Sequence, residues 1–175
     1  MESKSSIETL TAKYKAGNPA CFEELYQLLS PAVFAFVSHR TSSRESALDV
    51  TQDSFIELSR ALSSFTYQSD GAFYAFVYTI VRRQLAKHYA GAAKHATASE
   101  ATLETVADGT VSRETTLSVE AALGELDERA REIVVLHHWS RYTFGEIADI
   151  LDMTESAVRV RHHRAQATLA NLLNS

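Results

Sequence analysis

Two amphipathic helical stretches separated by a tight turn make up residues 143–173. Thr143 and Glu146 have the spacing of a capping box, in which each residue satisfies a backbone amide of the other at the start of a helix. The turn is expected at Asp152-Met153, and Thr154 can cap a second helix. Two short helices joined in this way are typical of a helix-turn-helix that reads DNA.

The second of these helices has two chemically different faces. Helical spacing places Val158, His162, Ala165 and Leu169 on the face that packs inward. The opposite face carries the candidate DNA contacts, which are Ser156, Arg159, Val160, His163 and Arg164. Arginine on such a face can bridge guanine acceptors or neutralise phosphate in a major groove. From this segment alone, an ordinary amphipathic helix whose arginines face water remains an alternative.

Helical periodicity also dominates the rest of the chain, so we expect an all-α protein. The sequence contains only 2 prolines and 6 glycines in 175 residues, and no long stretch alternates apolar with polar residues. Cys21 is alone, which excludes an internal disulfide framework and is typical of a reducing cytosol. With no signal-peptide pattern and no run of membrane-spanning length, we expect a cytoplasmic protein without membrane insertion.

Composition divides the chain into two small helical domains and a flexible linker. Apolar periodicity is present over residues 7–92, disappears over residues 93–118, where Ala, Thr and Ser dominate, and returns over residues 119–175. The sequence therefore predicts two helical bodies, each presenting its own DNA-facing surface.

Charge is distributed unevenly along the chain. The net charge is −5, but no acid occurs between Asp70 and Glu100, and three arginines follow Glu155. A strong nonspecific DNA binder usually contains a basic domain. We therefore expect weak DNA binding by the chain alone and dependence on a larger partner.

A basic and aromatic helix is predicted from Ala72 to about Ala90, after the polar loop 64–71. Its core side carries Phe73, Phe76, Val77, Ile80, Val81 and Leu85. Its other side carries Tyr74, Tyr78, Arg82, Arg83, Lys87 and His88, and the loop adds Phe65 and Tyr67. Basic residues interleaved with tyrosines can hold a strand through phosphate contacts and base stacking, which indicates a surface for unpaired or melting DNA.

An acidic helix is predicted over residues 44–63, with a capping box formed by Ser42 and Glu45. Its apolar positions include Ala47, Leu48, Val50, Phe55, Leu58 and Leu62. Its polar face carries Asp49, Gln52, Asp53 and Glu57. Composition alone favours a solvated face, and a docking face for a basic partner is the alternative.

Taken in this order, these segments resemble the bacterial sigma-70-type sigma factors, specifically the extracytoplasmic-function (ECF) group that keeps only regions 2 and 4. The resemblance covers about residues 10–173. Its region 2 motifs are the run Asp49-Val50-Thr51-Gln52-Asp53-Ser54-Phe55 and the segment AFYAFVYTIVRRQLAKHY, and its region 4 motif begins LDERAREIVVLHHW.

The resemblance implies an alternative sigma factor that binds core RNA polymerase and directs promoter recognition and melting. It assigns Asp49, Gln52 and Asp53 to the polymerase clamp. It assigns Phe65, Tyr67, Tyr78, Arg82 and Lys87 to the minus-10 element, where a nontemplate base is flipped and captured. The five exposed residues of the last helix would read the minus-35 element, and restraint by an anti-sigma factor is typical of the family.

This sequence departs from the family pattern at five positions. Thr51 and Phe76 replace an apolar residue and a tryptophan, and Arg83 replaces an asparagine. Asp152 stands where glycine commonly makes the turn, although aspartate tolerates a left-handed conformation. His162 stands where the family has an apolar residue, and we expect a buried, neutral histidine there.

Two other classes of function are less consistent with these residues. An enzyme or metal site would depend on His137-His138 and His162-His163, but no carboxylate or cysteine completes a ligand spacing around them, so we expect no enzyme, metal or cofactor. A dimeric helix-turn-helix regulator that binds an operator remains the alternative. The Asp49–Phe55 motif and the basic, aromatic helix favour polymerase docking and promoter melting instead.

Overall fold

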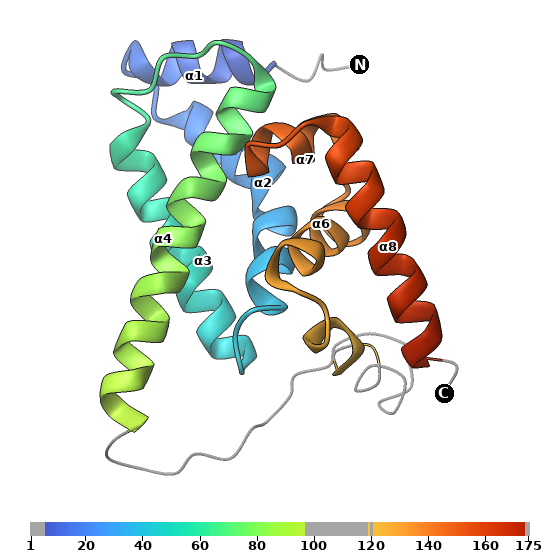
Figure 1. The fold of residues 1–175 in the computed structure, drawn as a ribbon. Helices are drawn as coiled ribbons and strands as arrows, with labels where there is room; N and C mark the ends of the chain where they lie inside the picture. The colour runs from blue at the N-terminus through green and yellow to red at the C-terminus, as the bar shows by residue number, and fades with distance from the viewer. Residues whose placement is uncertain (1–5, 97–118, 120, 174–175) are drawn as a thin grey trace.

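The computed structural model describes residues 6–96, 119 and 121–173, and all regular structure in these residues is helical (Figure 1). The helices are α1 Ile7–Lys15, α2 Ala20–Ser38, α3 Arg44–Ala61, α4 Asp70–Ala96, α6 Glu128–His138, α7 Phe144–Leu151 and α8 Glu155–Leu173. A further short helical stretch covers residues 121–124. The all-α prediction is confirmed. Helix α4 extends to Ala96, and residues 97–118 of the predicted linker lie outside the described residues.

Local capping signals explain where most helices begin. The Thr143 and Glu146 capping box is present, and the Asp127 side chain accepts from the amide of Ala130 at 3.0 Å. The predicted capping box at Ser42 is wrong by one residue. Ser43 has the extended backbone of an N-cap, and its hydroxyl accepts from the Ser46 amide at 3.1 Å.

Helix α2 is the central helix of the N-terminal bundle, α1–α4. Leu25, Leu29, Val33 and Phe36 are almost wholly buried, and Pro31 is accommodated within the continuous helix. By length and hydropathy α2 resembles a membrane span, contrary to the expectation that no run approaches that length. Its burial against the neighbouring helices explains these apolar residues as the core of a folded bundle.

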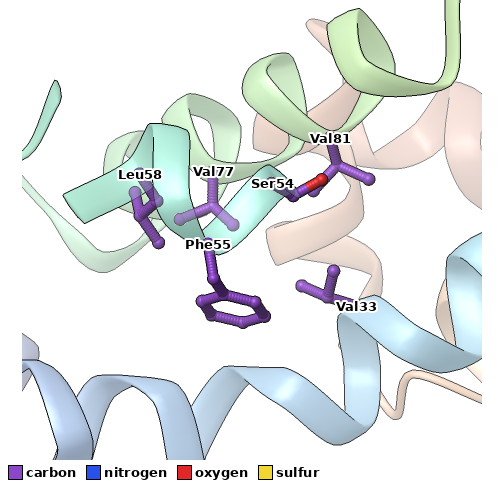
Figure 2. A pocket seen from close by; sticks show the side chains of 6 residues that line it. All are labelled: Val33, Ser54, Phe55, Leu58, Val77 and Val81. Atoms are coloured by element: carbon purple, nitrogen blue, oxygen red, sulfur yellow. The ribbon is translucent and has the colours of Figure 1, made fainter. Parts of the chain in front are cut away.

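Close packing continues where α2, α3 and α4 meet. Six side chains line the small apolar crevice in Figure 2, which are Val33, Ser54, Phe55, Leu58, Val77 and Val81. The one polar group, the hydroxyl of Ser54, donates to the carbonyl of Val50 at 2.6 Å. This crevice is therefore a packing gap of the core and is not a ligand pocket.

The C-terminal bundle consists of α6, α7, α8 and the helical stretch before them. A small cluster of its own is formed by Leu123, Leu126, Ala130, Val134 and Ala165. Most of its other buried residues belong to a larger cluster that begins in α1 and continues through α4 into α6, α7 and α8. Ile133, Leu136 and Ile147 are fully buried in this shared cluster.

The two bundles are therefore packed against each other. Helix α7 packs against α4, and α6 approaches α2 (Figure 1). The hydroxyl of Ser140, after α6, donates to the carbonyl of Ala32 in α2 at 3.0 Å. The prediction of two helical bundles is confirmed, but they are not independent bodies, because one core joins them. Part of the predicted DNA-facing side of α4, at Tyr78 and Arg82, therefore lies between the bundles.

Candidate nucleic-acid and partner interfaces

The turn between α7 and α8 has the geometry of a helix-turn-helix. Asp152 ends α7 in the left-handed conformation, with φ 53° and ψ 57°. The amide of Met153 donates to the carbonyl of Ala148 at 2.9 Å. The hydroxyl of Thr154 then accepts from the amide of Ala157 at 3.3 Å and caps α8. Aspartate thus makes the turn without glycine, as the sequence predicted.

Helix α8 turns the predicted DNA-reading face outward. Val158, His162 and Ala165 are buried, and Leu169 packs against the small cluster. The candidate minus-35 residues are all exposed, and they are Ser156, Arg159, Val160, His163 and Arg164. The two predicted faces are confirmed. Half of the apolar Val160 side chain faces solvent, which suits contact with a thymine methyl group.

Arg159 is held in place by two neighbours that sequence reasoning did not single out. Its Nε and Nη2 donate to Oε1 of Glu155 at 3.1 and 2.5 Å. Its guanidinium also lies over the Phe144 ring, 4.9 Å from the ring centroid. The i, i+4 spacing of Glu155 and Arg159 was a readable signal for this pair. To contact a base or a phosphate, the Arg159 guanidinium would leave the Glu155 carboxylate and donate to an acceptor of the DNA instead.

His162 is the buried, neutral histidine that the sequence predicted. Burial lowers its pKa to about 4, and the neighbouring His137 and His138 add to the effect. Its Nε2 lies 3.0 Å from Nε2 of His138. Within the described part of the chain, no three histidine, cysteine or carboxylate side chains are grouped to hold a metal ion.

The predicted polymerase-binding residues share the outer face of α3. Asp49, Gln52 and Asp53 are exposed. Leu48 and Ile56 on this helix are also exposed, at 48% and 41%. Leu48 had been assigned to the packed positions, and exposed apolar side chains bordered by carboxylates instead indicate a protein-docking surface.

The predicted minus-10 residues are distributed along α4 and the loop before it. Phe65 is half-buried and stacks on Phe76, with ring centroids 4.5 Å apart. Tyr67 is half-buried, and its hydroxyl donates to Asp70 at 2.8 Å. Lys87 is exposed near the other end of the helix. The structure therefore does not gather these side chains into one compact site.

Tyr78 is fully buried, so its assignment to an exposed face of α4 was wrong. Its ring packs edge-on against Phe36, 5.0 Å between centroids, and against Tyr142 of the C-terminal bundle at 5.6 Å. Burial raises the pKa of the Tyr78 phenol. Burial likewise raises the pKa of Tyr74, to about 12, where it meets the same Tyr142 ring. The side of α4 that carries Tyr74 and Tyr78 is therefore covered by the other bundle, whereas Thr79, Arg83 and Lys87 of the same helix are exposed.

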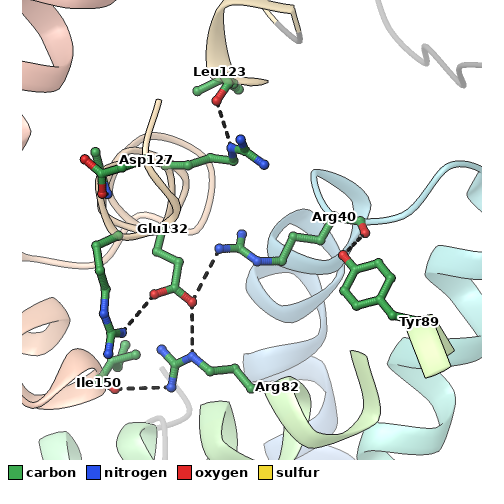
Figure 3. Close-up of polar contacts among 10 residues, drawn as sticks. Arg40, Arg82, Tyr89, Leu123, Asp127, Glu132 and Ile150 are labelled. Atoms are coloured by element: carbon green, nitrogen blue, oxygen red, sulfur yellow. Dashed lines mark hydrogen bonds and ion pairs between the residues drawn. The ribbon is translucent and has the colours of Figure 1, made fainter. Parts of the chain in front are cut away.

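Glu132 of α6 connects the bundles through a buried ionic cluster, shown in Figure 3. Only 4% of its side chain is exposed, and its carboxylate accepts from Nε of Arg82 at 3.1 Å. Arg40 and Arg129 reach it at 3.3 and 3.0 Å. Arg82 also donates to the carbonyl of Ile150 at 3.4 Å. A glutamate on the apolar side of a helix, next to Ile133, was the sequence signal for this cluster.

Comparison with known families matches both halves of the chain. The family described as Sigma-70 region 2 matches residues 25–95, and the family described as Sigma-70, region 4 matches residues 116–169. The ECF RNA polymerase sigma factor SigM of Mycobacterium tuberculosis is 30% identical over 170 residues, which are 97% of this chain and 85% of SigM.

Solved structures give the same result for the fold. The protein CnrH, solved in complex with the cytosolic domain of CnrY, superimposes with a TM-score of 0.66 at 26% identity, covering 94% of this chain and 95% of CnrH. The sigma factor RpoE of Bartonella quintana, solved with the anti-sigma factor NepR, gives a TM-score of 0.67 at 24% identity, covering 87% of this chain and 96% of RpoE.

Proposed function

Because this chain belongs to the extracytoplasmic-function group of sigma-70-type sigma factors, we propose that α8 reads the minus-35 promoter element through its exposed face. Like its family, the chain binds core RNA polymerase and directs promoter recognition. The contact residues are Ser156, Arg159, Val160, His163 and Arg164. Sigma factors are in general not catalysts, and this one initiates transcription only as part of the polymerase.

The observation that carries this proposal is the geometry of α7 and α8. A left-handed Asp152 orients α8, the buried Val158 and His162 fix its rotation, and two arginines lie on the outward face. This is the arrangement in which a recognition helix enters a major groove.

Core polymerase is expected to bind the outer face of α3. Asp49, Gln52 and Asp53 supply negative charge beside the exposed Leu48 and Ile56. A partner with basic residues around an apolar strip would complement this surface. We assign it to the clamp of the core enzyme, as the family resemblance implies.

The minus-10 element is expected to contact α4 and the loop before it. Lys87 is available to DNA in this arrangement, whereas Tyr78 and Arg82 contact the C-terminal bundle. Phe65 and Tyr67 are half-buried and lie in the loop before α4. Use of the whole surface for DNA melting therefore requires the bundles to separate.

An anti-sigma factor is the second proposed partner. CnrH, which covers almost the whole of this chain, was solved with the cytosolic domain of its partner CnrY. That similarity supports restraint of this chain by a comparable protein segment. Action with RNA polymerase also supports a cytoplasmic location for this chain.

Co-purification with core RNA polymerase, followed by run-off transcription on a promoter library, tests the proposed function. Polymerase-dependent transcripts with shared minus-35 and minus-10 sequences are expected. Sequence-specific binding to an operator as a dimer, without stimulation of polymerase, would favour the regulator class instead. Failure to associate with core enzyme would reject the sigma-factor function.

A further inference from the structure

We propose that Phe144, the first residue of α7, is a positioning residue that holds the Arg159 guanidinium on the DNA-reading face of α8. The reading of a base by Arg159 rests on the proposed function. The contact between the two side chains does not, because it is present in the free chain.

Two neighbours hold Arg159, and only one of them competes with DNA. Nε and Nη2 of the guanidinium donate to Oε1 of Glu155, so this contact uses the donors that a guanine or a phosphate would need. The Phe144 ring, whose centroid lies 4.9 Å from the guanidinium carbon, attracts the cation and takes none of its N–H groups. The ring contact can therefore persist while Arg159 reads a base, whereas the carboxylate contact is exchanged.

The half-buried Phe144 ring is itself held by side chains of α6 and α8. His137 stacks on it, with 4.4 Å between the ring centroids and 20° between the ring planes. A ring stacked this closely fills one face of Phe144 and leaves the other face to Arg159. His162 meets the same ring at 5.0 Å and 61°. Nδ1 of His137 lies 3.0 Å from the carbonyl oxygen of Tyr142, which fixes the imidazole in turn.

The backbone around Phe144 is also fixed. The amide of Thr143 donates to Oε2 of Glu146 at 2.7 Å, and the amide of Glu146 donates to the Thr143 hydroxyl at 3.3 Å. A Cβ atom on the neighbouring Gly145 would lie 3.7 Å from Oε2 of Glu155, so the first turns of α7 and α8 lie close together. The side chain one turn further along α8 therefore reaches the ring.

Positioning reduces the entropy that is lost when a base is read. A free arginine side chain loses rotamer freedom on binding, whereas a side chain already restricted by a fixed ring loses less. A bidentate contact with O6 and N7 of guanine also requires one orientation of the guanidinium. Phe144 should therefore sharpen the preference for the base that Arg159 reads more than it increases affinity for DNA in general.

A double-mutant cycle in the holoenzyme tests whether Phe144 acts through Arg159. Competition binding measures the preference for the best minus-35 sequence over its single-base variants. Phe144→Leu, which keeps an apolar side chain without the ring, should reduce this preference about two- to fivefold, as expected for an exposed cation–π contact. Phe144→Tyr keeps the ring and should retain the preference. Arg159→Ala should lose at least about fivefold, and adding Phe144→Leu to it should have no further effect.

Equal losses from Phe144→Leu with and without Arg159→Ala would overturn the positioning role, because Phe144 would then act on the fold or on the DNA itself. An unchanged preference in Phe144→Leu would also overturn it. If the wild type discriminates between minus-35 sequences and Arg159→Ala does so equally well, the proposed role of Arg159 is rejected, and the positioning role with it. Phe22→Leu, the same change at a half-buried phenylalanine of α2, is the matched control and should leave the preference unchanged.

Nuclear magnetic resonance of the free chain tests the geometry without DNA or polymerase. Nuclear Overhauser contacts between the Phe144 ring and the Hδ protons of Arg159 are expected in the wild type, and this measurement needs no variant of Phe144. Because protons over an aromatic face resonate upfield, Phe144→Leu should shift the Arg159 side-chain signals downfield, and Phe144→Tyr should not. Absence of the Overhauser contacts would overturn the platform even if promoter recognition by the wild type is normal.

Discussion

Glu132→Gln should destabilise the fold, because Glu132 is buried and pairs with three arginines. The carboxylate pairs with Arg40, whose side chain is 9% exposed, and with Arg82 and Arg129, which are 30% and 51% exposed. Burial lowers the pKa of Arg40, and the Glu132 charge opposes that effect. The amide of glutamine preserves the shape of the side chain but removes the charge that compensates Arg40.

The magnitude follows from the exposure of each arginine. Removing one partner of a buried pair costs about 3–5 kcal/mol, whereas exposed pairs contribute about 0–1 kcal/mol each. Arg40 therefore determines the loss, and we expect the free energy of unfolding to fall by about 3 kcal/mol. Separation of the bundles limits this loss, because it returns Arg40 to water.

Urea unfolding followed by circular dichroism, together with solution scattering, measures both consequences. Arg129→Ala, which removes the most exposed partner, is the control and should cost less than about 1 kcal/mol. Replacing the buried pair together, as Arg40→Met with Glu132→Leu, should recover most of the stability. Unfolding of Glu132→Gln within about 1 kcal/mol of wild type, with an unchanged radius of gyration, would refute the reasoning.

Three further predictions concern the exposed faces and the buried histidine. Arg159→Ala should lose about 1–3 kcal/mol of discrimination between minus-35 sequences, measured by competition binding of the holoenzyme. Arg161 is exposed but lies off that face, so Arg161→Ala should lose affinity without changing the preferred sequence. Asp53→Lys should weaken pull-down of core polymerase with normal thermal unfolding, and Glu24→Lys, the same charge change on α2, should not. His162 has a folded pKa of about 4 against an ordinary 6.5, so the unfolded chain takes up its proton first as the pH falls. The free energy of unfolding that neutral His162 contributes above pH 6.5 should be lost as the pH falls towards 4. Over this range the thermal unfolding midpoint of His162→Leu should decrease less than that of the wild type.

Local signals in the sequence predicted the helix-turn-helix well. The Thr143 and Glu146 capping box, the turn at Asp152 and the two faces of α8 depend on residues at most a few positions apart. Helical spacing alone therefore distinguishes the buried Val158 from the exposed Arg159. Such features need no knowledge of the rest of the fold.

Packing between distant segments explains what sequence analysis missed. Helical spacing assigns Tyr78 and Arg82 to the side of α4 opposite its apolar positions, yet long side chains with polar ends also pack between elements. The partner of Arg82 is Glu132, 50 residues away, and no periodicity connects them. One signal was available, because glycine in the first turn of a helix, as at Gly71, often marks a close approach of another element.

The C-terminal bundle and promoter DNA would compete for the side of α4 that carries Tyr74, Tyr78 and Arg82. If docking leaves only a small fraction of molecules open, the apparent affinity for melted DNA falls by that same fraction. A tenfold gain in affinity for single-stranded promoter DNA in Glu132→Gln, which removes the charge that pairs with Arg82 across the bundles, would therefore place the free energy of docking near about 1.4 kcal/mol. A ligand with equal affinity for the packed and the separated bundles does not shift the equilibrium between them. Binding of polymerase to the exposed Asp49–Asp53 surface can therefore shift it only if the enzyme also holds α8 or α4 in the separated form. The side of α4 that carries Tyr74, Tyr78 and Arg82 supplies such a difference, because DNA can contact these residues only when the bundles are apart.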